Sequence, residues 1–239
     1  MPQKIPTGCS LIDKFLNGGI LNESVSLIYG EPETGKTTLA LQCAINCARQ
    51  GYKTLFVDCD GTFSAIRLAQ IAGDQFKKIA ELIILMKPNN FREQALVIDQ
   101  LADYLTKSFG LLVIDTVTSL YRVQVAESPE KTFELNRELN RQLALLAQTA
   151  KIQKIAVLII SQVRTVFNET CVSIEPVATR VLKFWADTII EMKPTENPRI
   201  IKAILEKNPR KEKAFQHMAC LLKIEETGMH ESVIFNGAI

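Results

Sequence analysis

Residues Gly30–Thr37 have the types and the spacing of a phosphate-binding loop. They read Gly-Glu-Pro-Glu-Thr-Gly-Lys-Thr and match the pattern G-x-x-x-x-G-K-[ST]. In such a loop successive backbone N–H groups surround an anion, and the free N–H groups at the start of the next helix point toward it. Lys36 is predicted to reach the β- and γ-phosphates of a nucleotide, and the Thr37 hydroxyl to bind Mg²⁺. The residues predicted to contact the nucleotide here are Gly30, Glu31, Pro32, Glu33, Thr34, Gly35, Lys36, Thr37 and Thr38.

The residues on either side of the loop favour this interpretation over a glycine-rich turn with an unrelated lysine. An apolar run at about Ser24–Tyr29 predicts a buried strand before the loop, and Leu39–Ala48 has helical spacing after it. A strand, a glycine-rich loop and a helix in this order let backbone amides converge on a phosphate group. The sequence therefore predicts a nucleotide site at this position.

Asp115 is the second candidate for metal binding. It follows four apolar residues, Leu111–Ile114, at the end of a predicted buried strand. Its carboxylate is expected to hold Mg²⁺ through water beside Thr37. Many buried strands end in an aspartate, so this pattern is informative only because a phosphate loop precedes it in the same chain.

Two more polar residues follow apolar strands. Asp60 comes after Thr54–Val57 and is a candidate for orienting the water that attacks the γ-phosphate; a turn cap is the alternative. Gln162 comes after Ala156–Ile160, where its amide is a candidate sensor of the γ-phosphate; an ordinary polar strand end is the alternative. The carboxyl ends of parallel strands share one edge of a sheet, so these side chains can meet at the loop. The predicted catalytic residues are Lys36, Asp60 and Gln162.

Cationic side chains provide two further candidates for binding sites, one for the adenine ring and one for phosphate groups. The planar guanidinium of Arg67 can stack on an adenine ring, and a solvated helix-face arginine is the alternative. The segment 207–213 contains four basic residues and one glutamate. It reads either as a patch that contacts phosphates or as a solvated turn.

The composition limits the classes of function. The 239 residues carry a net charge of +2, so any contact with nucleic acid must come from a local patch. The six cysteines form no C-x-x-C pair and the chain has two histidines, which disfavours a zinc site. Cys43 and Cys47 are expected to be small buried residues. No signal peptide and no apolar run of membrane-spanning length is present, so we expect a reduced, cytoplasmic protein without membrane contact.

Strand and helix patterns alternate along most of the chain and predict an α/β fold. Strands that are apolar throughout are typical of a mostly parallel sheet with helices on both faces. We expect one domain, with a lead-in at 1–23, a nucleotide-binding core at 24–187 and antiparallel edge strands at 188–239. Helices are expected at Thr7–Leu16, Ala65–Ala72, Gln75–Glu81, Phe91–Lys107, Thr132–Lys151 and Arg180–Trp185, and further strands at Leu82–Met86 (buried), Thr188–Met192, Ile200–Leu205 and Cys220–Ile224.

The order of the motifs carries more information than any one of them. They are Thr7-Gly8, Asp13-Lys14, Gly18–Ile20, Gly30–Thr37, Asp58–Phe63, Arg67-Leu68, Leu112–Ser119, Leu139–Leu143, Ile160–Val163, Leu222–Ile224 and Thr227-Gly228. This series resembles the ATPase core of the RecA/RadA recombinase superfamily along essentially the whole chain. It is most similar to the short archaeal paralogues of RadA that lack an amino-terminal helix-hairpin-helix DNA-binding domain. We expect no such domain here, because the core begins within about ten residues of Met1.

The resemblance implies ATP and Mg²⁺ as cofactors and a role for each motif. Lys36 and Thr37 would bind phosphate and Mg²⁺, Asp115 would be the second-motif carboxylate, Arg67 would stack on adenine, and Gln162 would couple nucleotide state to DNA. Asp60 stands where the family has a catalytic glutamate, and its shorter side chain predicts slow hydrolysis. The stretches 122–134 and 163–176 correspond to the two DNA loops. The residues expected to contact DNA are Arg122, Arg164, Lys207, Arg210 and Lys211.

In both DNA-loop stretches the sequence differs from what is expected of a strand-exchange enzyme. The first DNA-loop stretch carries Glu127, Pro129 and Glu130, and the second lacks a Gly-Gly pair at its far end. We therefore expect an accessory protein of DNA recombination and repair that binds ATP, binds DNA weakly and modulates a RadA-type recombinase. A Holliday-junction-processing nuclease and a second copy of the chain are further candidate partners. The alternatives are a filament-forming recombinase and a KaiC-like ATPase that does not act on DNA.

Overall fold

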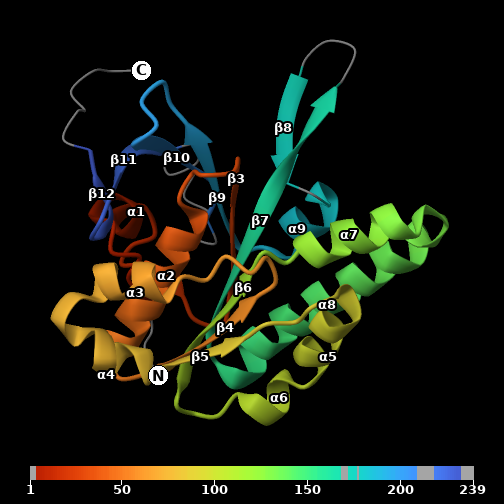
Figure 1. The fold of residues 1–239 in the computed structure, drawn as a ribbon, viewed down its shortest axis with the longest axis horizontal. Coiled ribbons are helices and arrows are strands. Elements are labelled where there is room, and N and C mark those ends of the chain that lie inside the picture. The colour runs from red at the N-terminus through yellow and green to blue at the C-terminus, as the bar shows by residue number, and fades with distance from the viewer. Residues whose placement is uncertain (1–3, 168–171, 177, 209–217, 233–239) are drawn as a thin grey trace.

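A central sheet organises the molecule, and helices cover both of its faces (Figure 1). The computed structural model describes residues 4–167, 172–176, 178–208 and 218–232. Within these residues the strand order is β12-β11-β10-β9-β3-β7-β6-β4-β5, and β8 pairs with β7 beside this path. The strands are β3 (Val25–Gly30), β4 (Lys53–Asp58), β5 (Ile83–Met86), β6 (Phe109–Asp115), β7 (Ala156–Phe167), β8 (Val172–Pro176), β9 (Thr188–Pro194), β10 (Ile200–Lys207), β11 (Ala219–Glu225) and β12 (Gly228–Glu231).

The helices divide into two layers. One face of the sheet carries α1 (Ser10–Phe15), α2 (Lys36–Arg49), α3 (Ala65–Ala72) and α4 (Phe76–Ala80), with the 3₁₀ turn η1 (Gly73–Gln75) before α4. The other carries α5 (Phe91–Asp99), α6 (Leu101–Tyr104), α7 (Ser119–Glu127), η2 (Pro129–Lys131), α8 (Thr132–Gln153) and α9 (Thr179–Trp185). A two-stranded sheet of β1 (Lys4–Ile5) and β2 (Ile20–Leu21) flanks α1. Figure 1 shows the two layers to the left and right of the sheet.

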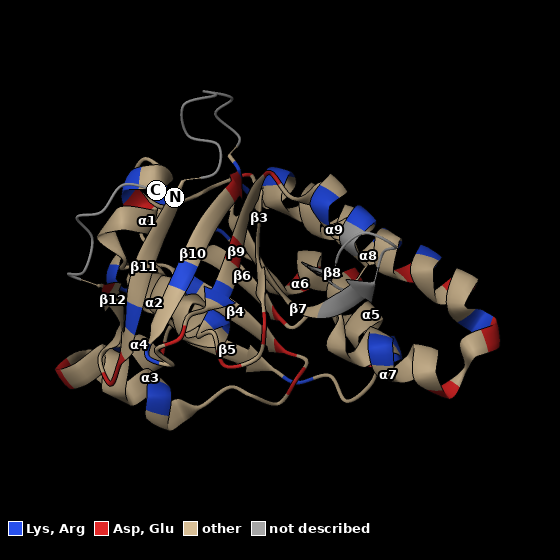
Figure 2. Ribbon diagram, turned by 90° about the horizontal axis from the view of Figure 1, so that it is seen from above, with Lys and Arg blue, Asp and Glu red and all other residues tan. Residues whose placement is uncertain are grey.

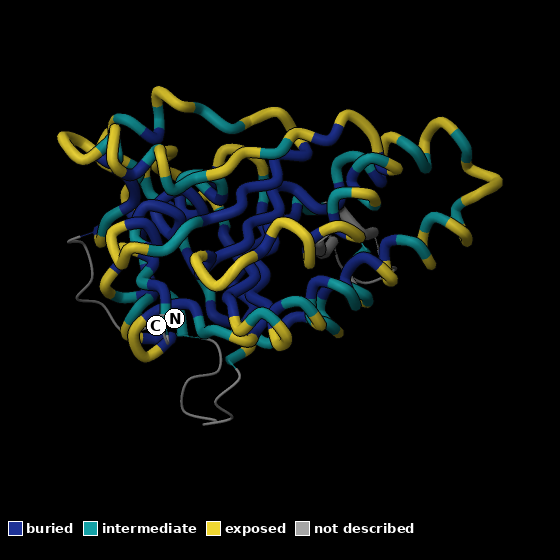
Figure 3. The backbone as a smooth tube through the Cα atoms, turned by 90° about the horizontal axis from the view of Figure 1, so that it is seen from below, coloured by how far each residue is buried: buried dark blue, intermediate teal, exposed yellow. Residues whose placement is uncertain are grey.

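Alternate residues of the central strands supply the two hydrophobic cores. In β3, Leu27 and Tyr29 face the α8 side, whereas Ile28 faces α2. In β7, Ile159 and Ile160 divide in the same way. Successive side chains of a strand point to opposite faces, so a strand covered on both faces must be apolar throughout. Figure 3 shows this burial concentrated in the sheet, with exposed positions toward the far ends of α7 and α8.

The parallel core and the antiparallel edge agree with the expected fold, with one correction. β3 pairs in parallel with β7, and β10 pairs antiparallel with β11. The strand expected at Thr188–Met192 is not antiparallel on both sides. As β9 it runs parallel to β3 and antiparallel to β10, so it joins the two parts of the sheet. The sequence pattern indicates that the strand is buried, but it does not indicate which strands pair with it.

Three other expectations differ from the structure. The strand expected to be buried at Leu82–Met86 is β5, and it is partly exposed because it lies at the sheet edge beside β4 alone. The single helix expected at Phe91–Lys107 is divided into α5 and α6. The first DNA-loop stretch is helical, since α7, η2 and the start of α8 occupy it. The strands β1, β2, β8 and β12 were not expected.

Burial of the cysteines is as expected. Cys43 and Cys47 lie on α2 in the hydrophobic core, and the structure also buries Cys9, Cys59 and Cys220. Burial raises the pKa of the Cys47 thiol to about 11, so the thiol stays protonated at neutral pH. Cys171 lies outside the described residues.

Candidate functional site

The phosphate loop connects β3 to α2 as the sequence predicts. β3 ends at Gly30, and α2 begins at Lys36. A Cβ atom at Gly30 would lie 2.1 Å from the backbone oxygen of Met192 on the paired strand β9, so only glycine fits there. Gly35 caps α2 with a φ of +79°, a left-handed conformation that glycine adopts readily. The two glycines therefore fix the points at which the chain leaves the sheet and enters the helix.

Lys36 lies inside this loop. Its side chain is nearly buried, and its Nζ donates to the backbone oxygen of Glu31 at 2.5 Å and to the Thr34 hydroxyl at 3.3 Å. Burial lowers the pKa of Lys36 to about 8, although Asp115, Asp60 and Glu31 act in the opposite direction. A buried ammonium group with its neighbouring amides is chemically suited to an anion of high charge.

Asp115 and Thr37 meet at the start of α2. The Thr37 hydroxyl donates to Oδ2 of Asp115 at 2.7 Å, and Asp115 is fully buried at the end of β6. Burial raises the pKa of Asp115 to about 6, and the charges of Asp60 and Asp58 raise it further. The hydrogen bond from Thr37 and the charge of Lys36 lower it.

The second carboxylate oxygen of Asp115 is suited to bind a metal ion. Oδ1 of Asp115 is buried and has no hydrogen-bond partner among the described residues. A hydroxyl and a carboxylate are the hard oxygen ligands that Mg²⁺ prefers, together with phosphate and water. Asp115 and Thr37 therefore fit a magnesium ion held beside the phosphates of a nucleotide. Asp58, by contrast, caps its own turn by accepting from the N–H groups of Thr62 and Phe63.

Asp60 and Gln162 are in direct contact, although they are 102 residues apart. Gln162 donates through Nε2 to Oδ2 of Asp60 at 2.8 Å. The hydroxyl of Thr116, next to Asp115, lies 3.5 Å from the same oxygen. Asp60 also acts electrostatically on Lys36, so the structure brings together all three residues that the sequence predicted to be catalytic.

Arg67 lies at the rim of this region, on α3. Its guanidinium donates to the backbone oxygens of Glu225 and Glu226 at 2.6 and 2.7 Å. Together with Thr38, these residues line a cavity of about 530 Å³ beside the start of α2. The cavity also includes Arg199 and Lys223, which the sequence pattern did not single out. Arg199 lies in the turn before β10 and Lys223 lies on β11, and exposed cations are common in both settings, so no local signal distinguishes them.

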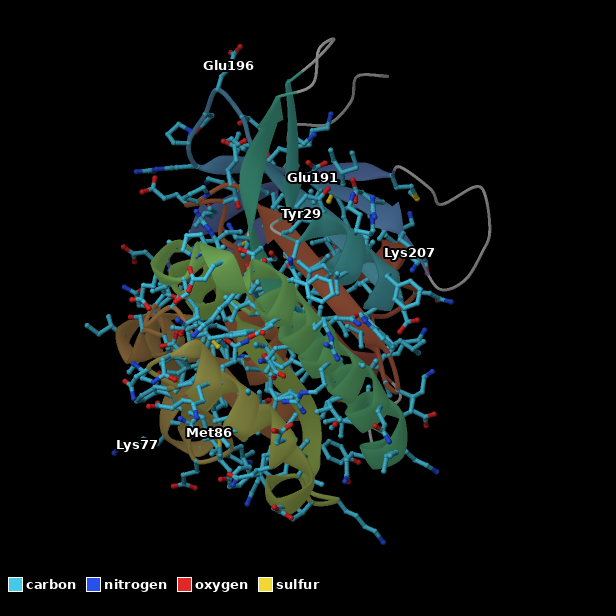
Figure 4. The ribbon with its side chains drawn as sticks, turned by 90° about the vertical axis from the view of Figure 1, so that its right-hand side faces the viewer. Tyr29, Lys77, Met86, Glu191, Glu196 and Lys207 are labelled. Carbon is cyan, nitrogen blue, oxygen red and sulfur yellow. The ribbon has the colours of Figure 1, made fainter. Side chains whose placement is uncertain are left out.

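The residues expected to contact DNA do not form one group. Arg122 is exposed on α7, and its Nη1 donates to Oε1 of Gln162 at 2.7 Å. The backbone of Arg164 lies in β7, at the hairpin that β7 and β8 form. Lys207 ends β10, and its Nζ donates to the backbone oxygen of Ala186. Figure 4 shows Lys207 in the part of the molecule that also holds Tyr29 and Glu191. Arg210 and Lys211 lie outside the described residues.

Comparison with known proteins identifies the family. A sequence model of the Rad51 family matches residues 3–231. The chain belongs to the Rad51 family. Its relatives include proteins named "DNA repair and recombination protein RadB". The one from Methanosphaera stadtmanae is 34% identical over 209 residues, which cover 87% of this chain and 88% of the relative. The one from Methanobrevibacter smithii is 35% identical over 193 residues, which cover 79% and 80%.

The fold of this Rad51 family member is similar to a solved structure described as "Crystal structure of the RadB recombinase". The two chains are 31% identical and have a TM-score of 0.81, and the match covers 95% of this chain and 99% of the other. The expected resemblance and the expected fold class are therefore confirmed. The described residues contain no cluster of three or more His, Cys, Asp or Glu arranged to hold a metal, and no helix with the length and apolarity of a membrane span.

Proposed function

We propose that this Rad51 family protein binds ATP with Mg²⁺, hydrolyses it slowly, and acts in DNA recombination and repair as an accessory to a RadA-type recombinase. The observation that carries the proposal is the convergence of Lys36, Thr37, Asp115, Asp60 and Gln162. Four of them follow or end the parallel strands β3, β6 and β4 at their carboxyl ends. Gln162, expected just after a strand that ends at Ile160, instead lies within β7, which continues to Phe167, at the point where its parallel pairing with β3 ends. This edge of the sheet is where α/β proteins bind ligands. The RadB names of the relatives support the recombination role.

Each of these residues has a distinct part. The loop amides and Lys36 would hold the β- and γ-phosphates, and Thr37 and Asp115 would hold Mg²⁺, which neutralises charge on the phosphates. Asp60 would accept a hydrogen bond from the attacking water, and the hydrogen bond that its Oδ2 accepts from Gln162 supports this role. Gln162 can both donate and accept, so it can respond to the γ-phosphate. Arg67 and the cavity beside Thr38 would hold the base.

Calorimetric titration with ATP and Mg²⁺ tests the nucleotide site. The wild-type chain should bind, and Lys36→Ala should lose binding while keeping its circular dichroism spectrum. Thr106→Ala removes an exposed hydroxyl before the start of β6, at the end of that strand opposite Asp115; it is the control and should bind like wild type. Affinity of Lys36→Ala within a few-fold of wild type would remove Lys36 from the site.

The hydrolysis step has its own variant. Asp60→Glu restores a longer carboxylate, and its extra C–C bond adds about 1.5 Å of reach. The steady-state ATPase rate should rise, because a misplacement on the order of 1 Å can cost about a hundredfold in rate. A flat or lower rate would show that Asp60 is not the group that orients water.

Binding of DNA is tested by titrating fluorescent single-stranded DNA at several salt concentrations, with and without ATP. We expect weak binding that salt reduces, since backbone charge supplies most of it. No binding at low salt would favour an ATPase that acts without DNA. Strand exchange by the chain alone would favour a self-sufficient recombinase.

Co-purification of a RadA-type recombinase from native lysate tests the protein partner. The same pull-down reports a junction nuclease or a second copy of the chain.

A further inference from the structure

Two glutamines lie completely buried where α5 and α8 pack against each other on one face of the sheet (Figure 1). Gln94 on α5 and Gln142 on α8 are both 0% exposed. The Nε2 atom of Gln94 donates to Oε1 of Gln142 at 2.8 Å. It also donates to the backbone oxygen of Val117 at 3.1 Å. Both hydrogens of one amide nitrogen are therefore used, one between the helices and one on the loop that follows β6.

The acceptors determine which way the amide of Gln94 points. A backbone oxygen has no donor, so it must face the amide nitrogen. The Nε2 atom of Gln142 donates to the carboxylate of Glu138 at 3.2 Å, so the oxygen of Gln142 is left to face Gln94. If the amide of Gln94 turned over, its oxygen would meet two acceptors. The present orientation places both donors and leaves Oε1 of Gln94 buried without a hydrogen-bond partner among the described residues.

The backbone that Gln94 holds belongs to the segment just after Asp115. The pairing of β6 with β4 ends at Asp115, and its pairing with β7 ends one residue earlier, at Ile114. Beyond this point the N–H of Val117 donates to the backbone oxygen of Ile160 at 3.1 Å, and the oxygen of Val117 accepts from Gln94. The backbone at Val117 is thus held by a strand on one side and by a helix on the other.

The position of this segment bears on Asp115, the proposed ligand for Mg²⁺. One residue separates Asp115 from Val117, and its carboxylate accepts a hydrogen bond from Thr37 at Oδ2, whereas Oδ1 has no partner in the described part of the chain. Mg²⁺ demands nearly ideal octahedral geometry, so a small rotation of a ligand costs affinity. A contact that fixes the backbone two residues away can therefore change metal binding without touching the metal.

The fold alone does not require two glutamines at this place. A buried amide costs free energy unless it is hydrogen-bonded, and replacing both partners of a buried hydrogen bond by apolar groups of the same shape can be nearly neutral. Methionine has a similar unbranched shape. Other buried residues of the same two helices, such as Phe91, Ile98 and Leu143, are apolar. The contact with Val117 is what an apolar pair would not supply.

We propose that Gln94 is a positioning residue for the magnesium site. By holding the backbone at Val117, it fixes the orientation in which the carboxylate of Asp115 meets Mg²⁺. Its effect is on the Mg²⁺ complex of the nucleotide rather than on the nucleotide alone. The inference rests on the proposed function, because it requires a nucleotide at the phosphate loop.

The test measures the gain in ATP affinity that Mg²⁺ provides, expressed as the Kd in EDTA divided by the Kd in Mg²⁺, both from calorimetric titration. Gln94→Met should lower this ratio by about fivefold, the equilibrium equivalent of one net hydrogen bond. Its Kd in EDTA should match that of wild type, since Lys36 and the loop amides are unchanged. A merely structural fault would weaken binding in both titrations and leave the ratio as it is.

Gln142→Met is the matched control. It makes the same change in an equally buried glutamine and removes the same hydrogen bond between the two amides, but it leaves Gln94 bonded to Val117. Both single variants should lower the unfolding free energy in urea, because each leaves a buried polar group unpaired. Gln142→Met should nevertheless keep the wild-type gain from Mg²⁺.

A double variant keeps the test decisive if Gln94→Met folds poorly. Changing both glutamines to Met removes both partners of the buried hydrogen bond and should recover part of the lost stability. Its gain from Mg²⁺ should stay about fivefold below that of wild type, because the hydrogen bond to Val117 is still missing. The proposal is overturned if the gain recovers with stability, if Gln94→Met keeps the wild-type gain, or if Gln142→Met loses as much of it.

The same titrations keep this proposal apart from the proposed function. If wild type binds ATP with a gain from Mg²⁺ and Gln94→Met shows the same gain, the positioning role fails and the nucleotide site stands. If wild type binds ATP without any gain from Mg²⁺, the metal site fails, and the positioning role fails with it. If wild type does not bind ATP in either titration, the proposed function itself fails.

Discussion

Lys36 combines a functional charge with a cost in stability. Burial lowers its pKa to about 8, so its charged form is less favourable in the folded chain than in the unfolded chain. The folded state bears this cost below pH 8, and the cost disappears as the pH rises from about 8 toward the ordinary lysine pKa of about 10.4. Under the proposed function, the binding of phosphate by Lys36 offsets this cost.

Lys36→Met is therefore expected to have opposite effects on stability and binding. The free variant should gain on the order of 2 kcal/mol in unfolding free energy at pH 7, because methionine fills similar space without a charge. Saturating Mg²⁺ and ATP, at about 100 times Kd, should stabilise wild type by about 2.7 kcal/mol and leave the variant unchanged. Urea unfolding with and without nucleotide measures both. A free variant less stable than wild type would contradict the pKa argument.

The ionisation of Asp115 makes both the stability of the chain and its Mg²⁺-dependent binding of ATP depend on pH. Its pKa is raised to about 6 in the folded chain, so its ionisation costs free energy there, and the chain loses this stability as pH rises through 4 to 6. Mg²⁺ needs the ionised carboxylate. The gain in ATP affinity on adding Mg²⁺ should therefore be present at pH 7 and shrink below pH 6. Titrations in Mg²⁺ and in EDTA measure it, with Asp115→Asn as a control that should show little gain at any pH. An equal gain at pH 5 and pH 7 would rule out Asp115 as the metal ligand.

At the scale of elements, Arg141 joins two helices. Its guanidinium contacts Asp99 on α5 at 2.6 Å and Glu138 one turn earlier on α8 at 2.7 Å. The hydrogen bond from Arg141, followed by that from Gln142, lowers the pKa of Glu138. The stabilisation is present above the ordinary glutamate pKa and is lost as pH falls through the lowered value.

Arg141→Met should destabilise the chain by about 1 kcal/mol at pH 7, since the network is half exposed and solvent screens it. The difference from wild type should shrink as the pH falls through the lowered pKa of Glu138, because its carboxylate then takes up a proton. Urea unfolding at pH 7 and in acid measures this, and Arg137→Met is the matched exposed control. A pH-independent loss would mean that Arg141 acts through packing alone.

Some features of the helices, strands and loops could be predicted from the sequence, and others could not. The phosphate loop and Asp115 are local patterns, because the chemistry requires fixed residues at fixed spacing in one segment. The strand neighbours of β9 and the edge position of β5 are set by sheet order, which no single segment encodes. The contact of Arg122 with Gln162 joins residues 40 apart, and no spacing rule reaches that far. The helix α7 lies where a loop was expected, because the order of the family's motifs along the sequence does not determine the local conformation between them.

For the whole molecule, the distribution of charge bears on assembly with DNA. Figure 2 shows acidic positions beside a basic one at the far end of α7 and α8, and basic positions spread over both layers. The stretch that corresponds to the first DNA loop is helical and carries the exposed Glu127 and Glu130. A net charge of +2 adds little general attraction to a polyanion. A continuous basic track, which a filament on DNA requires, is not visible in the described part of the chain.

The chain alone is therefore expected to remain a small particle in the presence of DNA and ATP. With only a few phosphate contacts, about two to four, the logarithm of its affinity for single-stranded DNA should fall with the logarithm of salt at a slope of about −1.4 to −2.8. Sedimentation velocity with ATP, Mg²⁺ and a long single strand measures the assembly, and a RadA-type recombinase under the same conditions is the control that should form large complexes. Changing Glu127 and Glu130 together to Gln removes the acidic charge from the helical stretch. This double variant should bind DNA more tightly without forming filaments, because charge is altered and the helix is kept. Large ATP-dependent complexes of the wild-type chain would show that a helical first-loop stretch is compatible with filament growth, and the accessory role would then give way to a self-sufficient recombinase.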